Sequence, residues 1–236
     1  FIRISNKNFV SNTTRLLDLI GGAMFLTAMS PVPAAYMAYA SSTVFFLVLY
    51  LAYFILRFVS QLYVQDGNPL THLAHSLMGQ IYVIMPLGLL SYMYSRYGMY
   101  VLLAMFILIW LSDTGAFCVG SLMGRHKLFE RISPKKSWEG FFGGLLFCLA
   151  ASAFFYFYGN GVFGYLNLWQ LLGMGAVVCV FGTWGDLVES LIKRSLGVKD
   201  SGSLLPGHGG ILDRIDSLLL VTPALLLYLV GVNWFG

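Results

Sequence analysis

Long runs of apolar residues constrain the fold of this chain more than any other feature. The windows 41–59 and 97–119 each contain a single charged residue, and about 20 mostly apolar residues are enough for one helix to cross a membrane. Only 10% of all residues are charged, whereas a soluble domain carries about 25%. Because a water-exposed surface cannot be built from so few charges, the sequence predicts an all-α, polytopic transmembrane helical bundle.

Seven windows are predicted to span the membrane. They are 16–33, 41–59, 73–94, 97–119, 139–158, 168–187 and 214–232. The first window is the weakest, because it contains Asp18 and runs into two prolines. The chain starts with Phe rather than Met, so we expect residues 1–96 to be N-terminal helices from which earlier spans are missing. Residues 97–236 are expected to form a second part with two polar loops.

Basic residues lie almost entirely on one side of this arrangement. Thirteen of the fourteen Lys and Arg residues share that side, and Arg96 is the exception. Because Lys and Arg are retained on the cytoplasmic side, we expect an integral protein of a bacterial-type inner membrane with its polar loops in the cytoplasm. Other isolated charges and histidines are interpreted as boundary or interfacial residues: Asp18, Arg57, Asp66, His72 and His75.

Charge and cysteine patterns exclude two kinds of site. The net charge of +4 arises from two loops rather than from a basic stripe, so a nucleic acid partner is not expected. Cys118, Cys148 and Cys179 lie in apolar stretches without metal-ligand spacing, and we interpret them as packing residues. The glycine pairs 120/124 and 140/144 fit the G-x-x-x-G pattern, which is typical of close helix packing.

A polar stripe follows the end of the sixth window. Asp186, Glu189, Ser190 and Lys193 are spaced i, i+3, i+4 and i+7, so a helix places them on one face. The stripe presents two carboxylates, a hydroxyl and an ammonium near the membrane surface. A solvated helix end with internal ion pairs is the structural alternative.

The segment that follows the stripe is rich in glycine and charge. Three glycines surround His208 in the sequence PGHGG at 206–210, which suits a loop that brings backbone N–H groups close to a ligand. Asp213 and Asp216 then open the last window three residues apart. The helix dipole favours carboxylates at that position, but capping explains only one of the two.

This combination of residues predicts a site for a metal and phosphate groups. Mg²⁺ is held by one or two carboxylates together with substrate phosphates, and Asp186, Asp213 and Asp216 supply such ligands; whether one or two cations bind stays open. Nearby basic residues would face the phosphates: Lys193, Arg194, Lys199 and Arg214. Metal and cations together are typical of phosphoryl or nucleotidyl transfer.

A second loop has the sequence SPKKSWEG at 133–140. A loop that only orients the chain in the membrane would need the basic residues but not the rest of this segment. Lys135 and Lys136 suit an anionic headgroup or a triphosphate, and attraction to anionic lipid is the alternative. Ser133 is expected to cap a turn that Pro134 stiffens. Asp113 lies in the cytoplasmic third of its window, where an unpaired carboxylate is costly, so we expect it to face the same polar cavity.

Residues 190–216 match the pattern S-x-x-K-R-x4-K-D-x-G-x2-L-P-G-H-G-G-x2-D-R-x-D at every defined position. In this segment, and at 112–117 and 133–140, the chain closely resembles the phosphatidate cytidylyltransferases, also called CDP-diacylglycerol synthases. The resemblance extends from about residue 97 to the C-terminus. It implies that CTP and phosphatidate give CDP-diacylglycerol and pyrophosphate, a step of phospholipid biosynthesis, with Mg²⁺ required.

The resemblance also suggests roles for single residues. Asp186 and Asp213 correspond to the family's metal-binding aspartates, and Asp216 belongs to the same motif; residues 97–236 would then be the catalytic domain. The expected catalytic residues are Asp186, Asp213, Asp216, Lys193 and His208. The expected substrate-binding residues are Asp113, Lys135, Lys136, Ser190, Arg194, Lys199, Gly209, Gly210 and Arg214. The separate roles of the basic residues and of His208 are inferred from charge and spacing.

Three kinds of partner are expected: CTP, phosphatidate and membrane lipid, with a homodimer left open. Two other functions stay in view. A CTP-dependent kinase of polyprenol or phytol would release CDP instead of pyrophosphate. An ion-coupled transporter would need polar residues toward the outer face, yet the outer halves of the later windows are almost wholly apolar.

Overall fold

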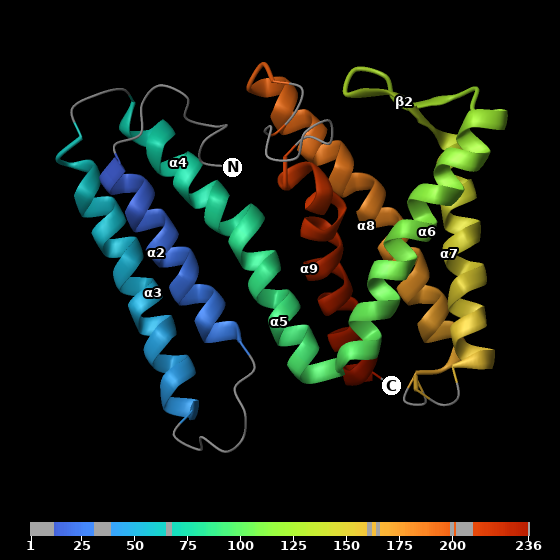
Figure 1. Cartoon of the computed structure of the whole chain (residues 1–236), viewed down its shortest axis with the longest axis horizontal. Helices are drawn as coiled ribbons and strands as arrows, with labels where there is room; N and C mark the ends of the chain where they lie inside the picture. The colour runs from blue at the N-terminus through green and yellow to red at the C-terminus, as the bar shows by residue number, and fades with distance from the viewer. Residues whose placement is uncertain are drawn as a thin grey trace. The chain divides into compact units, whose positions relative to one another are not determined.

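The computed structural model describes residues 12–30, 39–64, 68–159, 162–163, 166–198, 201 and 210–235. Helices make up nearly all of this part of the chain, with one small pair of strands (Figure 1). The chain divides into two compact units, Phe1–Arg96 and Tyr97–Gly236. Each unit has its own packing and is taken in turn.

The N-terminal unit consists of long helices in sequence order. They are α2 (Asn12–Met29), α3 (Tyr39–Gln61), α4 (Pro69–Gly79), the π-helical turn η1 (Gln80–Ile84) and α5 (Met85–Tyr97). The helix α4 begins sharply, because the Asn68 side chain accepts a hydrogen bond from the Leu70 N–H at 3.0 Å and Pro69 occupies the first turn. It continues through η1 into α5, so residues 69–97 form one long helical element.

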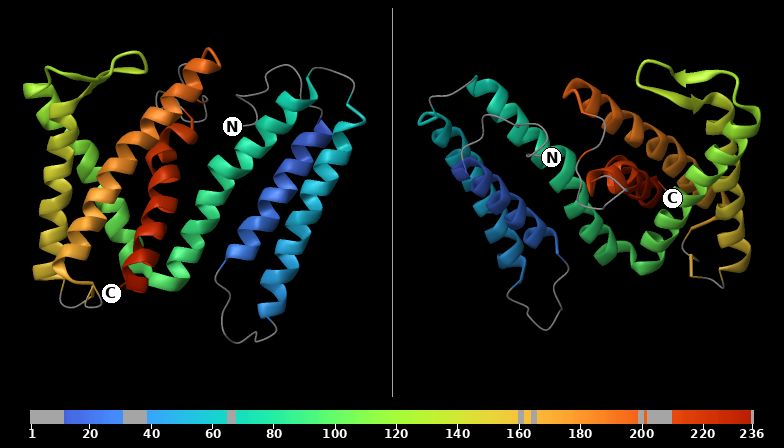
Figure 2. Two further views of the ribbon diagram at one scale, coloured as in Figure 1. Left: turned by 180° about the vertical axis from the view of Figure 1, so that it is seen from behind. Right: turned by 45° about the horizontal axis from the view of Figure 1, so that its top comes forward.

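The C-terminal unit contains four long helices and a β-hairpin. They are α6 (Met99–Met123), β1 (Lys127–Phe129), β2 (Ser133–Ser137), α7 (Trp138–Tyr158), α8 (Leu168–Ser195) and α9 (Leu212–Phe235). Within this unit α8 contacts α6, α7 and α9, and α6 contacts α7 (Figure 2). The unit is therefore built around α8.

Six helical elements in the described part of the chain are long and apolar enough to cross a membrane. They are Val44–Gln61, Pro69–Tyr97, Met99–Met123, Trp138–Tyr158, Leu168–Ser195 and Leu212–Val232. Large apolar side chains such as Leu51, Ile55 and Leu227 stay exposed on these helices, as lipid-facing residues do. The prediction of an all-α polytopic membrane protein is confirmed. The first predicted window forms α2, which is not among the six.

Glycines bring α6 and α7 into direct backbone contact. A Cβ atom on Gly144 would lie 2.7 Å from the Ser112 carbonyl oxygen, and one on Gly140 would lie 2.9 Å from the Ala116 carbonyl oxygen. The predicted close packing at glycines 140 and 144 is confirmed. Gly124 differs, because it ends α6 and its N–H donates to the Gly120 carbonyl at 3.0 Å.

A buried ion pair lies inside the N-terminal unit. Arg57 Nε is 3.2 Å from Asp18 Oδ1, and each side chain is 3% exposed. The Tyr53 hydroxyl donates to Asp18 Oδ1 at 2.9 Å, and the Ser76 hydroxyl donates to Asp18 Oδ2 at 2.7 Å. The arginine also donates to the carbonyl of the buried His72 at 3.4 Å. The pair thus joins α2, α3 and α4.

This ion pair corrects the interpretation of Asp18 and Arg57 as boundary charges and of His72 as interfacial. Hydropathy of a single helix does not reveal its neighbours, so a charge near the end of a window is predicted to be solvated. Side-by-side packing of three helices instead removes these groups from solvent and supplies their partners. Asp66 lies outside the described residues.

We predict that Arg57→Met destabilises the protein strongly, because Asp18 then remains buried without a cation. Removing one partner of a buried ion pair costs about 3–5 kcal/mol. Thermal unfolding in detergent measures this loss. The double variant Asp18→Asn with Arg57→Met should regain part of it, and a double variant that is less stable than Arg57→Met would contradict the assignment.

Gly144→Ala is predicted to lower the unfolding temperature, because its methyl group meets the backbone of α6 rather than a movable side chain. Gly231→Ala in α9 is the matched control, since a Cβ there has nothing within 4 Å among the described residues. Equal unfolding temperatures for the two variants would refute the backbone contact.

Candidate active site

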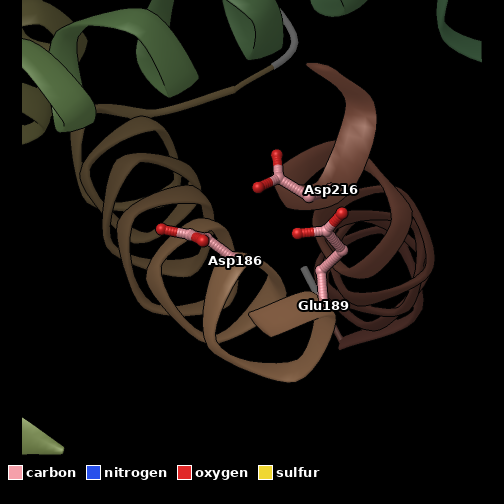
Figure 3. A group of neighbouring side chains, drawn as sticks. All are labelled: Asp186, Glu189 and Asp216. Carbon is pink, nitrogen blue, oxygen red and sulfur yellow. The ribbon is translucent and has the colours of Figure 1, made fainter. Parts of the chain in front are cut away.

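Three carboxylates from two helices converge in the C-terminal unit. Asp186 and Glu189 project from α8 and Asp216 projects from α9 (Figure 3), and one oxygen from each lies within 4.8 Å of the others. The helices approach closely here because Gly185 has no side chain: a Cβ on it would lie 2.8 Å from the Asp216 carbonyl oxygen. We call Asp186, Glu189 and Asp216 the carboxylate cluster.

Glu189 is the most deeply buried member of the cluster. Its side chain is 1% exposed, and apart from the Lys193 ammonium its oxygens have no hydrogen-bond donor among the described residues. Its Oε2 atom forms an ion pair with the Lys193 ammonium, one turn along α8. A buried carboxylate that lacks hydrogen-bond donors is costly unless a cation lies against it. The three carboxylates of the cluster are contacted by two ammonium groups, those of Lys193 and Lys136, and their oxygens are the ligands that suit a hard divalent cation.

Lys193 connects the cluster to a second polar network. Its ammonium also lies 2.8 Å from Asp213 Oδ1. Asp213 Oδ2 accepts hydrogen bonds from the Ser201 N–H at 2.9 Å, the Ser201 hydroxyl at 2.6 Å and the Gly210 N–H at 2.7 Å. Asp213 thus holds Ser201 and Gly210 at the start of α9.

The carboxylate cluster differs from the expected set of Asp186, Asp213 and Asp216. Among the described residues, Glu189 stands in the cluster where Asp213 was expected. Asp213 is three residues before Asp216 and its oxygens are engaged by an ammonium, a hydroxyl and backbone N–H groups. Sequence reasoning placed Glu189 on the polar stripe but not among the metal ligands. The signal available in the sequence was the three-residue spacing between Asp186 and Glu189, which puts both carboxylates on one face of a helix.

Asp186 is held from two directions. The Ser190 hydroxyl donates to its Oδ1 at 3.3 Å, as the stripe spacing predicts. Lys136 comes from the hairpin, and its Nζ lies 2.6 Å from Asp186 Oδ2 and donates to the Thr183 carbonyl at 3.0 Å. The structure therefore brings the second polar loop onto the polar stripe.

A cleft of about 400 Å³ lies where the hairpin meets α6, α7 and α8. Asp113, Lys135, Lys136 and Asp186 all line it, and the charges of Lys136 and Asp186 act on Asp113. The remaining lining residues are mainly small or apolar: Ala116, Phe117, Gly120, Ser121, Leu128, Ser133, Ser137, Gly140, Phe141 and Thr183. Asp113 thus faces a shared cavity, as the sequence predicts.

The loop between α6 and α7 forms a β-hairpin, whereas the sequence predicts only a turn stiffened by Pro134. Strands β1 and β2 pair antiparallel, with Lys127 opposite Ser137. Ser137 caps α7 by accepting from the Gly140 N–H at 3.2 Å, whereas Ser133, expected to cap a turn, begins strand β2. Glu139 secures the base of the hairpin, where its carboxylate lies 2.6 Å from His126 Nδ1.

Five further predicted site residues remain to be placed. Lys199, His208 and Gly209 lie outside the described residues. Arg194 and Arg214 are exposed on α8 and α9 and are not among the residues that line the cleft.

Comparisons with known proteins identify the family of this chain. A model of the cytidylyltransferase family matches residues 1–232. A phosphatidate cytidylyltransferase of Staphylococcus aureus (strain COL) is 50% identical over 135 residues, which are 56% of this chain and 50% of that protein. Those of Staphylococcus haemolyticus (strain JCSC1435) and Staphylococcus epidermidis (strain ATCC 12228 / FDA PCI 1200) are 50% and 49% identical over 133 residues, with the same shares covered. The chain spans about half the length of these curated relatives.

We predict that Mg²⁺ stabilises the unsubstituted protein and that Glu189→Gln largely removes the effect. A ligand present at 100 times its dissociation constant stabilises the folded state by about 2.7 kcal/mol, which a thermal unfolding series with and without Mg²⁺ detects. Glu130→Gln is the matched control, because Glu130 is exposed on the hairpin and outside the cluster. An equal Mg²⁺ response in both variants would show that Glu189 is not a ligand.

Proposed function

This chain belongs to the cytidylyltransferase family, and we propose that it transfers the cytidylyl group of CTP to phosphatidate, giving CDP-diacylglycerol and pyrophosphate. The observation that carries this proposal is the carboxylate cluster of α8 and α9 beside a cleft lined by lysines. The name of the matched relatives, phosphatidate cytidylyltransferase, supports the choice of substrates.

The proposed reaction is a single displacement at phosphorus. A phosphate oxygen of phosphatidate forms a bond to the α-phosphorus of CTP, and the bond from that phosphorus to the bridging oxygen of the β-phosphate breaks. Pyrophosphate takes the bonding electrons and leaves. Both substrates are anionic, so the protein must mainly bring phosphates together and neutralise their charge.

The carboxylate cluster is the proposed site of Mg²⁺. Glu189 is buried and has no hydrogen-bond donor other than Lys193 among the described residues. Its oxygens and those of Asp186 and Asp216 fit a hard cation. When bound there, Mg²⁺ would supply positive charge to the phosphate oxygens. We propose that Asp213 supports this site by orienting Lys193 and the residues that flank α9, rather than as a member of the cluster.

Basic residues are proposed to bind the phosphates. Lys135 and Lys136 line the cleft from the hairpin and would face the triphosphate, while Lys193 offsets the negative charge of the cluster. Roles for Lys199, His208, Gly209, Arg194 and Arg214 in substrate binding are proposed from the sequence pattern.

We propose that the site faces the cytoplasm from a bacterial inner membrane. CTP and pyrophosphate are water-soluble, whereas phosphatidate is a lipid, so the reaction needs a site at the membrane surface. The distribution of Lys and Arg supports this orientation, since it puts the hairpin and the end of α8 on the retained side.

The purified protein, supplied with CTP and phosphatidate, is predicted to release pyrophosphate in amounts equal to the CDP-diacylglycerol formed. Asp186→Asn should lower turnover by about 10²–10³-fold, as loss of one group that stabilises transition-state charge does. Asp213→Asn should also lower turnover by orders of magnitude while membrane insertion stays intact.

Separate assays of pyrophosphate and CDP decide between the possible reactions. Release of CDP with a phosphorylated lipid would indicate the kinase instead. Unchanged turnover in Asp186→Asn would remove the cluster from the mechanism, and membrane fractionation of each variant shows whether low turnover reflects failed insertion.

A further inference from the structure

Lys136 forms an ion pair with a carboxylate that the proposed cation site needs. Its Nζ lies 2.6 Å from Asp186 Oδ2, and Ser190 donates to Oδ1 of the same residue at 3.3 Å. A cation that approaches the cluster therefore meets Asp186 with one oxygen in an ion pair and the other in a hydrogen bond. Because the ammonium of Lys136 repels a divalent cation at Asp186 Oδ2, the cation would bind Asp186 more tightly once this lysine moved away.

The two lysines at the cluster differ in how firmly they are held. Lys193 is 16% exposed and contacts two carboxylates, those of Glu189 and Asp213. It stands on the same helix as Glu189, one turn away. Lys136 is 24% exposed, and among the described residues it contacts one carboxylate, that of Asp186, and donates to the Thr183 carbonyl; it reaches both from another element. Lys193 is thus a fixed counterion of the cluster, while Lys136 is the one that can exchange.

Lys136 also stands where a released ammonium would meet a phosphate. It lines the cleft together with Asp113 and Lys135. The ion pair with Asp186 is partly exposed, with Asp186 itself 37% exposed, so a competing charge can reach it. If the Lys136 ammonium moved away from Asp186 and met no other anion, it would lose its ion pair. A triphosphate in the cleft would give it a new anionic partner.

We propose that Lys136 is an exchangeable counterion that couples cation binding to nucleotide binding. Its ammonium holds Asp186 when the cluster has no divalent cation, and turns to a phosphate of the nucleotide when Asp186 binds one. The inference rests on the proposed function and adds cooperativity to it: the cation and the triphosphate each bind weakly alone and tightly together. Such coupling typically changes an affinity by about 5- to 150-fold, and it acts equally on both ligands.

A purely structural role for Lys136 predicts something different. Its contacts with Asp186 and the Thr183 carbonyl also fasten the hairpin to α8. If fastening were its whole role, Lys136→Met would lower stability but would not tighten the binding of a free cation. Cation affinity in the absence of nucleotide is therefore the readout that separates the two roles.

The experiment measures Mn²⁺ binding by electron paramagnetic resonance, using the purified protein after EDTA treatment, with and without CTP. For the unsubstituted protein, CTP should lower the Mn²⁺ dissociation constant about tenfold, within the usual range of coupling. Lys136→Met should bind Mn²⁺ about tenfold more tightly without CTP, and CTP should then lower the dissociation constant by a smaller factor than in the unsubstituted protein. Lys136→Arg keeps the charge and should keep the coupling.

Lys135→Met is the matched control, because Lys135 lines the same cleft but has no ion pair among the described residues. It removes the same charge and should leave the Mn²⁺ affinity without CTP within about twofold, as expected for an exposed and screened charge. Equal tightening in Lys135→Met would assign the effect to overall charge and overturn the proposal.

Two other outcomes also overturn it. One is the same Mn²⁺ affinity in Lys136→Met as in the unsubstituted protein, and the other is no Mn²⁺ binding in either protein. Pyrophosphate release by the unsubstituted protein, measured on the same preparation, tests the proposed function separately, so that the exchange can fail while the reaction stands.

Discussion

A carboxylate surrounded by lipid or packed helices is stable only when a cation or several donors lie against it. This requirement explains the main polar contacts of both units. Glu189 has Lys193 one turn away, and Asp18 has Arg57 with two hydroxyl donors. In the carboxylate cluster, Glu189 has no donor among the described residues other than this lysine. A chain that otherwise avoids charge thus concentrates it where an additional cation would be stabilising.

Close helix contact makes this concentration possible. Gly185 lets α8 approach the backbone of α9 beside Asp216, and Gly144 does the same for α7 against α6. The second contact places the hairpin, which connects α6 to α7, so that Lys136 reaches Asp186. Because these contacts are between backbones, the polar groups gain a defined geometry that flexible side-chain packing would not provide.

Local periodicity accounts for what could be predicted of the site. The stripe on α8 was recognised from spacing alone, and the Ser190 to Asp186 hydrogen bond agrees with it. That Glu189 rather than Asp213 joins Asp186 and Asp216 was beyond such reasoning, since Asp213 and Asp216 lie three residues apart near the start of α9 and either could face α8. The pairing of Asp18 with Arg57 was missed for the same reason, because it joins residues on different helices.

The sequence by itself determined that the chain is a helical membrane protein, that its charges gather in two loops and one helical stripe, and that its later part resembles the cytidylyltransferases. Apolar length, 3.6-residue periodicity and a long motif are properties of contiguous residues, so they can be read without a fold. Only the tertiary structure decided that Glu189 joins Asp186 and Asp216, that Asp213 binds Ser201 and Gly210, and that Lys136 pairs with Asp186. These contacts depend on how helices are rotated and crossed, which is set by packing between segments far apart in the chain.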